Sequence, residues 1–196
     1  MSIYGEQQSL FNVSEQRALS RYNLRTKPHL DIDSEALQTW KADLHRYQCR
    51  VRDSQSPQQP ALFPIESAVI DPATIDPFAL DYHNFFFFNL PARHHPEDPC
   101  IYFVVDTGVP ILLYVGETCQ ANQRWKGVHD CKHYVLNYQS VHFQHRMPTT
   151  INTAFWWDTP AQTKPRQLLE SGLIARWKSP FNKENWTFWK TPFIGN

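Results

Sequence analysis

The residue that most clearly suggests chemistry is Glu170, because it lies at the edge of an otherwise apolar helical face. It directly follows Leu169 and precedes Ile174 by one turn, in the segment LLESGLI. An unpaired buried carboxylate is costly, so a glutamate in this position extends to water, pairs with a cation or ligates a metal ion. The local pattern leaves all three roles open.

Two tyrosines lie upstream of this helix in a predicted β-hairpin. The stretch CIYFVVDTGVPILLYVGET, residues 100–118, contains two apolar runs joined by the turn signal DTG, which is typical of a hairpin. Tyr102 lies in the first run, and Tyr114 lies near the end of the second, which becomes polar at Glu117. Strand tyrosines usually pack in the core or across strands, and these two could instead form the floor of a site.

Further elements must hold these residues in place. Apolar spacing predicts a helix that begins near Asn122, and alternation predicts a third strand at 151–158. The helix that carries Glu170 should begin after Thr159 or Thr163 and end before Pro180. The expected fold class is therefore α+β, with a three-stranded, mainly antiparallel sheet flanked by helices.

Five landmarks in this order resemble the GIY-YIG nuclease family. Its domain has a Gly-Ile-Tyr strand, a second strand ending in Tyr-Ile-Gly, a helical arginine, a helical glutamate and then an asparagine. The matching positions here are CIY at 100–102, YVG at 114–116, Arg124, Glu170 and Asn182. Arg124 lies ten residues after Tyr114, a spacing that is frequent in the family. Asn182 lies twelve residues after Glu170, which is also frequent, and the resemblance covers residues 100 to about 185.

Two positions depart from the family pattern. Cys100 replaces the first glycine, and a strand residue whose role is backbone pairing tolerates a small side chain. Many members carry His or Tyr four residues after the arginine, where this chain has Val128. We assign that role to His129, with His133, one turn later, as the alternative.

The resemblance implies a metal-dependent DNA endonuclease that hydrolyses phosphodiester bonds in restriction, repair or recombination. Glu170 would bind a divalent cation, Mg²⁺ or Mn²⁺, which polarises a phosphate oxygen and stabilises the leaving 3′ oxygen. Arg124 would neutralise the charge that develops on the phosphoryl oxygens. Tyr102, alone or with His129, would orient and deprotonate the attacking water.

The remaining roles follow from the same resemblance. Tyr114 would hold a phosphate or share the proton path, and Asn182 would brace the site. The expected substrate-binding residues are Gly116, Lys126, His133 and Lys183.

Other interpretations stay open. The first is a catalytically inactive module on the same fold that binds DNA or a sliding clamp, and the second is a structural protein whose aromatic residues form the core. His129 and His133 are four residues apart and could bind zinc, although no third ligand has a clear spacing.

Residues 1–99 are expected to form an extension to a nuclease-like domain at 100–196. The extension should comprise a mobile arm, an amphipathic helix at 34–52, a proline-rich linker at 53–64 and short strands, of which FFFFNL is the best candidate. The apolar face of the helix should pack on the domain, while its basic face, with Lys41, His45, Arg46 and Arg50, should be solvated.

Two short peptides in the extension resemble the Gln-x-x-Leu-Phe motifs by which bacterial proteins dock onto the replication sliding clamp. They are QQSLF at Gln7–Phe11 and QPALF at 59–63. Both lie in segments expected to be flexible, where Leu and Phe can act as hydrophobic anchors.

The composition limits the partners. Lys+Arg and Asp+Glu both number 19, so the net charge is zero. The charge is nevertheless divided, because residues 1–119 have nine basic and fifteen acidic side chains, whereas residues 120–196 have ten and four. A basic C-terminal half fits a polyanion such as DNA, or it neutralises the other half within one fold.

The remaining sequence features concern the compartment and the assembly. The four cysteines show no CxxC spacing, which favours free thiols in the cytoplasm. No apolar run suggests a membrane span or a secretion signal. Cutting both strands of a duplex with one active site per chain would favour a homodimer or sequential nicking.

Overall fold

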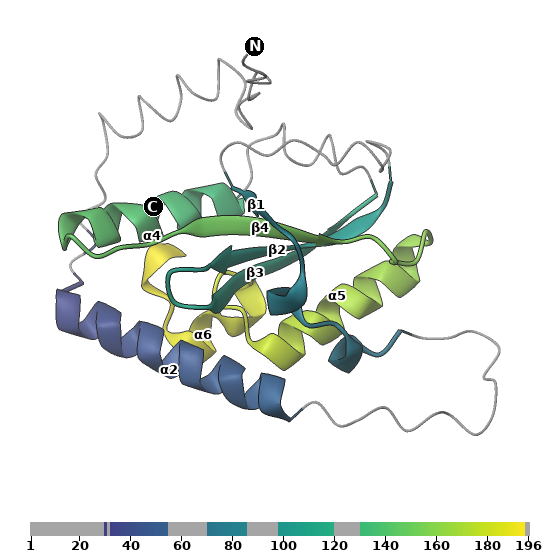
Figure 1. Cartoon of the computed structure of the whole chain (residues 1–196), viewed down its shortest axis with the longest axis horizontal. Coiled ribbons are helices and arrows are strands. Elements are labelled where there is room, and N and C mark those ends of the chain that lie inside the picture. Colours follow the sequence, from purple (N-terminus) through teal and green to yellow (C-terminus); the bar gives the residue numbers. More distant parts are fainter. Residues whose placement is uncertain (1–29, 31, 55–69, 86–97, 120–129, 195–196) are drawn as a thin grey trace, which may run out of the picture.

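The computed structural model describes residues 30, 32–54, 70–85, 98–119 and 130–194 of the chain. Over these residues the protein is α+β, with helices packed around one antiparallel sheet (Figure 1). The sheet has four strands in the order β1-β4-β2-β3. The sequence predicted three strands, and the additional one, β1, comes from the region expected to be an N-terminal extension.

The strands are β1 (Tyr82–Asn84), β2 (Cys100–Asp106), β3 (Ile111–Thr118) and β4 (Ile151–Trp156). Strands β2 and β3 form the predicted hairpin, and β4 confirms the strand predicted at 151–158. Strand β2 lies between β3 and β4, and all of its residues are buried.

A β-bulge interrupts the β2–β3 pairing. Val104 pairs with Tyr114 and Val105 pairs with Leu112, so that Leu113 is the extra residue on β3. The bulge changes the alternation of β3, and consecutive residues Leu113 and Tyr114 both contact the same core. It thereby places Tyr114 on the same face of the sheet as Tyr102.

The helices are α2 (Ser34–Asp53), α4 (Asp130–Gln144), α5 (Thr163–Trp177) and α6 (Trp186–Trp189). Short 3₁₀ helices occupy Pro72–Thr74, Pro77–Ala79, Lys183–Asn185 and Pro192–Ile194. Helix α2 confirms the predicted amphipathic helix, and the Asp33 carboxylate caps it by accepting a hydrogen bond from the Ala36 amide at 2.7 Å. Helix α5 ends at Trp177, and Lys178 adopts the left-handed conformation at its C-cap.

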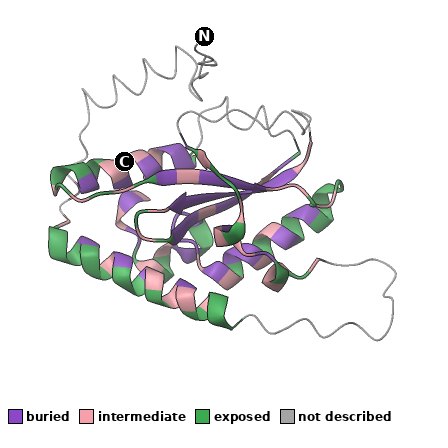
Figure 2. Ribbon diagram, in the orientation of Figure 1, coloured by how far each residue is buried: buried purple, intermediate pink, exposed green. Residues whose placement is uncertain are grey.

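The core has two parts, one on each face of the sheet. The first joins Tyr102 and Val104 to residues of α2 and α4, including Leu37, Leu44, Val135 and Tyr138. The second joins the alternate β2 residues to α5: Ile101, Phe103, Val105, Leu169, Leu173 and Trp177. Figure 2 shows the strands as mostly buried and the outward faces of α2 and α5 as exposed.

Lys41 corrects the prediction that the basic face of α2 is solvated. This lysine is only 4% exposed, and its Nζ lies 3.0 Å from an Asp106 carboxylate oxygen at the end of β2. The other members follow the prediction more closely, because Arg46 and Arg50 are exposed and His45 is half-buried. Helix α2 buries part of its polar face because it lies along the edge of the sheet and also contacts α4.

Several sequence predictions concern residues outside the described part of the chain. The mobile arm, both clamp-like peptides and most of the linker lie there, as does the FFFFNL segment except for the buried Phe85. The start of the helix predicted near Asn122 lies there too. All four cysteines are described and are free thiols. Among the described helices, none combines the length and apolar character needed to cross a membrane.

Candidate functional site

The hairpin brings the two tyrosines together. The ring centroids of Tyr102 and Tyr114 lie 5.9 Å apart, with an angle of 32° between the ring planes. Tyr102 is only 1% exposed, whereas Tyr114 is half-buried and lines a pocket. Tyr114 is therefore the tyrosine of this pair that reaches the pocket.

Gly116 allows Tyr102 to take this position. The two residues are partners across the β2–β3 ladder. A Cβ built on Gly116 would fall inside the van der Waals envelope of the Tyr102 ring, at Cζ and Oη. The absence of a side chain at 116 is thus required for the Tyr102 ring to lie across the neighbouring strand.

Strand β3 lies at the end of the sheet, and side chains from outside the sheet form hydrogen bonds with its backbone on the edge that has no neighbouring strand. Glu170 Oε1 accepts a hydrogen bond from the Glu117 amide at 3.0 Å. Asn182 binds Val115 twice, since its Oδ1 accepts from the amide at 2.9 Å and its Nδ2 donates to the carbonyl at 2.8 Å. These contacts hold α5 and the segment after it against the edge of β3.

Further along the same edge, α2 contributes a similar clasp. The Gln48 side chain donates to the Leu112 carbonyl at 2.9 Å and accepts from the Leu112 amide at 2.7 Å. The Phe181 amide donates to the Leu113 carbonyl at 2.9 Å. Side chains and backbone from α2, α5 and the segment after α5 therefore cover the edge of β3. These contacts hold Glu170, Phe181 and Asn182 in place around the pocket.

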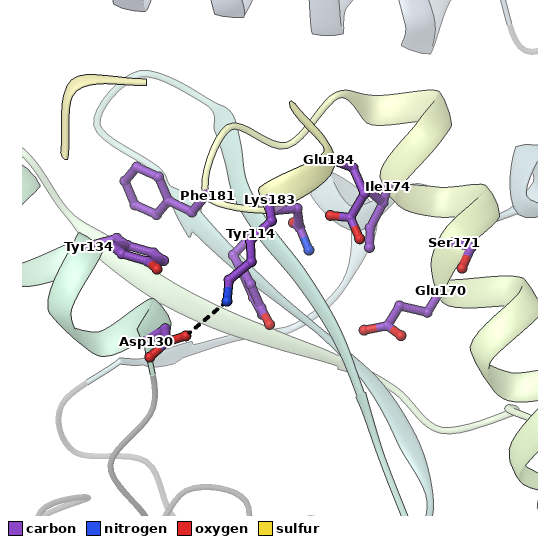
Figure 3. Close-up of a pocket in the computed structure, with 10 residues that line it drawn as sticks. Tyr114, Asp130, Tyr134, Glu170, Ser171, Ile174, Phe181, Lys183 and Glu184 are labelled. Carbon is purple, nitrogen blue, oxygen red and sulfur yellow. Dashed lines mark ion pairs between the residues drawn. The ribbon is translucent and has the colours of Figure 1, made fainter. Parts of the chain in front are cut away.

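A pocket of about 390 Å³ lies between the β3 edge, the start of the described part of α4 and helix α5. Its lining consists of Tyr114, Asp130, Tyr134, Glu170, Ser171, Ile174, Phe181, Asn182, Lys183 and Glu184. The Tyr114 ring lies between Glu170 on one side and the Asp130–Lys183 pair on the other (Figure 3). The nearest oxygen of that ion pair lies 3.5 Å from Lys183 Nζ, and both side chains are 68% exposed.

A buried ion pair supports the glutamate of the pocket. Arg166 is 1% exposed, and its Nε donates to Glu117 Oε2 at 2.6 Å. Its Nη1 donates to the carbonyls of Pro160 and Ala161 at 3.1 and 2.8 Å. Because the Glu117 amide binds Glu170, Arg166 fixes the residue that orients the Glu170 carboxylate.

Cys100, which stands where the family pattern has glycine, is a buried thiol. Burial raises the pKa of its thiol to about 12, so the thiol stays protonated at neutral pH. It serves as a small, fully buried strand residue opposite Thr118.

The pocket collects four of the residues predicted for the site: Tyr114, Glu170, Asn182 and Lys183. Tyr102 packs against the pocket residue Tyr114, and Gly116 is the cross-strand partner of Tyr102 in the hairpin. His133 is half-buried on α4 and does not line it. Arg124, Lys126 and His129 lie outside the described residues. The alternative zinc site, which needs His129, therefore stays a prediction.

Sequence reasoning missed other members of the lining, notably Asp130, Tyr134, Ser171 and Glu184. Two signals were available. Asp130 and Tyr134 are four residues apart on α4, so they share a helical face, and Glu184 closely follows Asn182. Neither signal identifies a pocket until the packing of α4 against the sheet is known.

The chain matches no protein-family model, no curated protein and no solved structure.

Proposed function

We propose that the protein is a metal-dependent DNA endonuclease of the GIY-YIG type, which hydrolyses phosphodiester bonds at the pocket beside β3. The observation that carries the proposal is the convergence of Tyr114, Glu170 and Asn182 on one pocket. They come from a strand, a helix and the segment that follows this helix. The order and spacing of these same positions in the sequence resemble the GIY-YIG pattern.

Glu170 is the residue that would hold a divalent cation. Mg²⁺ usually binds one or two carboxylates and completes its shell with water and substrate phosphates. Glu170 shares the open pocket with the carboxylates of Asp130 and Glu184, and among the described residues no group of three or more His, Cys, Asp or Glu side chains has metal-binding geometry. Glu170, completed by water and substrate phosphates, fits this chemistry. The cation would supply Lewis-acid activation of the phosphate.

The structure favours a division of labour between the two tyrosines. Tyr114 lines the pocket, so we assign it the position nearest to the attacking water and the phosphate. Tyr102 is buried behind it and would act through Tyr114 by packing. This assignment reverses the roles expected from the resemblance, in which Tyr102 activates the water.

Other residues supply charge and support. Lys183 lines the pocket, and it can turn from Asp130 to a phosphate because both side chains are exposed. Asn182 binds the backbone of β3 and thereby keeps the next residue, Lys183, at the pocket. Arg124 and His129 keep the roles that the resemblance implies, neutralisation of phosphoryl charge and assistance to the base.

The decisive experiment is a cleavage assay on supercoiled plasmid and branched synthetic duplexes with Mg²⁺ or Mn²⁺. The informative variant is Glu170→Gln, because a glutamine oxygen can still accept the hydrogen bond from the Glu117 amide while the charge is removed. Glu35→Gln removes an exposed carboxylate from the first turn of α2 and serves as the matched control.

Cleavage that requires the metal, persists in Glu35→Gln and is lost in Glu170→Gln supports the proposal. Absence of cleavage of every substrate by folded wild-type protein contradicts it. In that case a DNA-binding module without turnover becomes the better description.

A further inference from the structure

An aromatic pair on the surface lies outside the pocket. Phe188 of α6 is 57% exposed. Its ring packs edge-on against Tyr47 of α2, with centroids 6.0 Å apart. Phe188 also packs edge-on against Trp189 of the same four-residue helix, with centroids 4.9 Å apart, and more than half of the residue stays open to solvent.

Cations surround this pair. Lys178 Nζ lies 5.6 Å from the Phe188 ring centroid. Arg50 and Arg176 lie close enough to Tyr47 to act on its hydroxyl, where they oppose the rise in pKa that burial causes. The pair therefore lies between cationic side chains of α2, in the N-terminal half of the chain, and of the C-terminal half.

Two lysines here adopt a backbone conformation that lysine disfavours. Lys178 has φ 50° and Lys190 has φ 48°, each at the C-cap of a helix, where glycine is the usual residue. The Trp189 indole donates a hydrogen bond to the Lys178 carbonyl, which brings the two C-caps near each other. Lysine at both positions adds charge to this surface at a conformational cost.

The start of α6 lies next to residues of the pocket. Lys183 Nζ lies 5.9 Å from the Trp186 ring centroid, and Trp186 packs against Tyr134 with centroids 5.7 Å apart. Lys183 and Tyr134 both line the pocket. Helix α6 thus begins beside the pocket at Trp186, and Phe188, two residues later, lies on the side of the helix that faces Tyr47 of α2.

We propose that the α6 surface, defined by Tyr47, Arg50, Lys178, Phe188 and Lys190, binds a single-stranded segment of DNA that extends from the pocket. Single-strand binding proteins combine cations that follow the phosphates with aromatic rings on which bases stack. Duplex DNA does not offer the face of a base, whereas an unpaired base can lie on Phe188. The inference rests on the proposed function for the identity of the ligand, and it specifies a substrate with an unpaired strand.

The test is the binding of a fluorescently labelled single-stranded oligothymidylate to the full chain, measured by anisotropy in EDTA so that no cleavage occurs. The first variant combines Lys178→Gly and Lys190→Gly, because glycine prefers the left-handed conformation and should preserve the fold. Lys164→Gly, at an exposed lysine near the start of α5, is the single-charge control. The double variant should bind more weakly, and its salt slope should fall by about 1.4, roughly 0.7 for each lost phosphate contact.

The aromatic contribution is tested separately. Phe188→Ala should weaken binding at least about fivefold without changing the salt slope, and Phe188→Tyr should restore it. Phe143→Ala is the matched control, because Phe143 on α4 is also exposed, at 86%. Single-stranded DNA should bind more tightly than duplex DNA of the same length.

The inference is overturned if the double variant and Phe188→Ala bind as tightly as their controls, or if the losses are equal for duplex and single strand. Its failure is distinguishable from that of the proposed function. If cleavage depends on Glu170 but these variants bind DNA normally, only the proposed binding surface is contradicted. If these variants bind DNA more weakly but no cleavage occurs, only the proposed nuclease activity is contradicted.

Discussion

The Tyr102 ring lies across Gly116, its partner on the neighbouring strand, so closely that a side chain at 116 would collide with the ring. The tyrosine of CIY and the glycine of YVG are therefore coupled by packing as well as by their place in the motif. The hairpin register makes them opposite residues, and the bulge at Leu113 keeps Tyr114 on the same side. A spacing that suggests catalysis also serves the geometry of the hairpin.

Replacement of Gly116 by alanine should destabilise the protein by about 1–3 kcal/mol, the usual cost of adding a methyl group to a filled site. Urea denaturation measures the free energy of unfolding. The collision with Tyr102 predicts coupling, so Gly116→Ala should cost much less in a Tyr102→Ala background. Additive effects of the two substitutions would show that another neighbour of position 116 is responsible.

Asn182→Ala should also destabilise the protein by about 1–3 kcal/mol, because the amide and carbonyl of Val115 would both lose a buried partner. Asn152→Ala is a suitable comparison, since Asn152 makes its side-chain bond to the Thr107 hydroxyl at 2.8 Å in a half-buried position. Thermal and urea denaturation of both variants give the comparison. An equal, small loss in each would mean that Asn182 does not brace the β3 edge.

The local elements could be predicted from the sequence because their signals are local. The DTG turn between two apolar runs predicted β2 and β3, and the apolar spacing of α2 predicted a helix within one residue of its observed bounds. Long-range features gave no such signal. Strand β1 is three residues of polar and aromatic character, and only its pairing with β4 makes it a strand.

Lys41 shows that long-range ion pairs, like β1, could not be predicted from the sequence. Its helical position marks it as a member of a basic face, and the sequence cannot show that Asp106, 65 residues away, lies beside it. The candidate site divides similarly. The position of Glu170 at the edge of an apolar face was predictable, whereas its contact with the Glu117 amide depends on how α5 meets the edge of the sheet. Asp130 and Tyr134 became site residues only through the packing of α4.

Substitution of the two tyrosines by phenylalanine should separate their roles. Under the proposed function, Tyr114→Phe should reduce kcat at least about tenfold, because it removes the hydroxyl that reaches the pocket. Tyr102→Phe keeps the ring that packs over Gly116 and should change kcat less. The two cleavage rates at saturating DNA and metal give the answer, and a larger loss in Tyr102→Phe would restore the roles expected from the resemblance.

The buried contact between Lys41 and His142 should make the stability of the fold sensitive to acid. His142 is fully buried on α4, where its Nδ1 lies 2.7 Å from the Tyr138 carbonyl and its Nε2 lies 3.0 Å from Lys41 Nζ. The Nδ1–H donates to the carbonyl, so Nε2 must be unprotonated to accept from the lysine. Burial, helped by Lys41, lowers the pKa of His142 from the ordinary 6.5 to about 4, while the Tyr138 carbonyl and Asp106 act to raise it.

The pKa of Asp106 is also lowered in the folded protein, so protonation of Asp106 likewise destabilises the fold. Burial alone would raise its pKa, but the Thr150 amide, Lys41 and the Tyr138 hydroxyl stabilise the carboxylate and hold the pKa below its usual range. Thr149 adds a hydrogen bond at 2.9 Å. His145 is the remaining titratable group that acts on His142, and it also disfavours the protonated ring.

The sign follows from proton uptake. As the pH falls below about 6.5, the unfolded chain protonates His142 while the folded protein does not, so the free energy of unfolding decreases until the pH nears 4. The full loss from this histidine is on the order of 3 kcal/mol. Asp106 then adds a further loss below the pKa of an unfolded aspartate, about 3.9. Urea denaturation between pH 7 and 4 measures the first part.

His142→Gln should flatten this dependence, because glutamine does not titrate. Its starting stability at pH 7 should be lower, since the contacts with Lys41 and the Tyr138 carbonyl are altered, but the slope is the relevant quantity. His133→Gln on the same helix should retain the slope, because His133 lies nine residues before His142 and is only half-buried. A slope that survives in His142→Gln would locate the acid sensitivity in other groups and leave the buried lysine as a purely structural partner of Asp106.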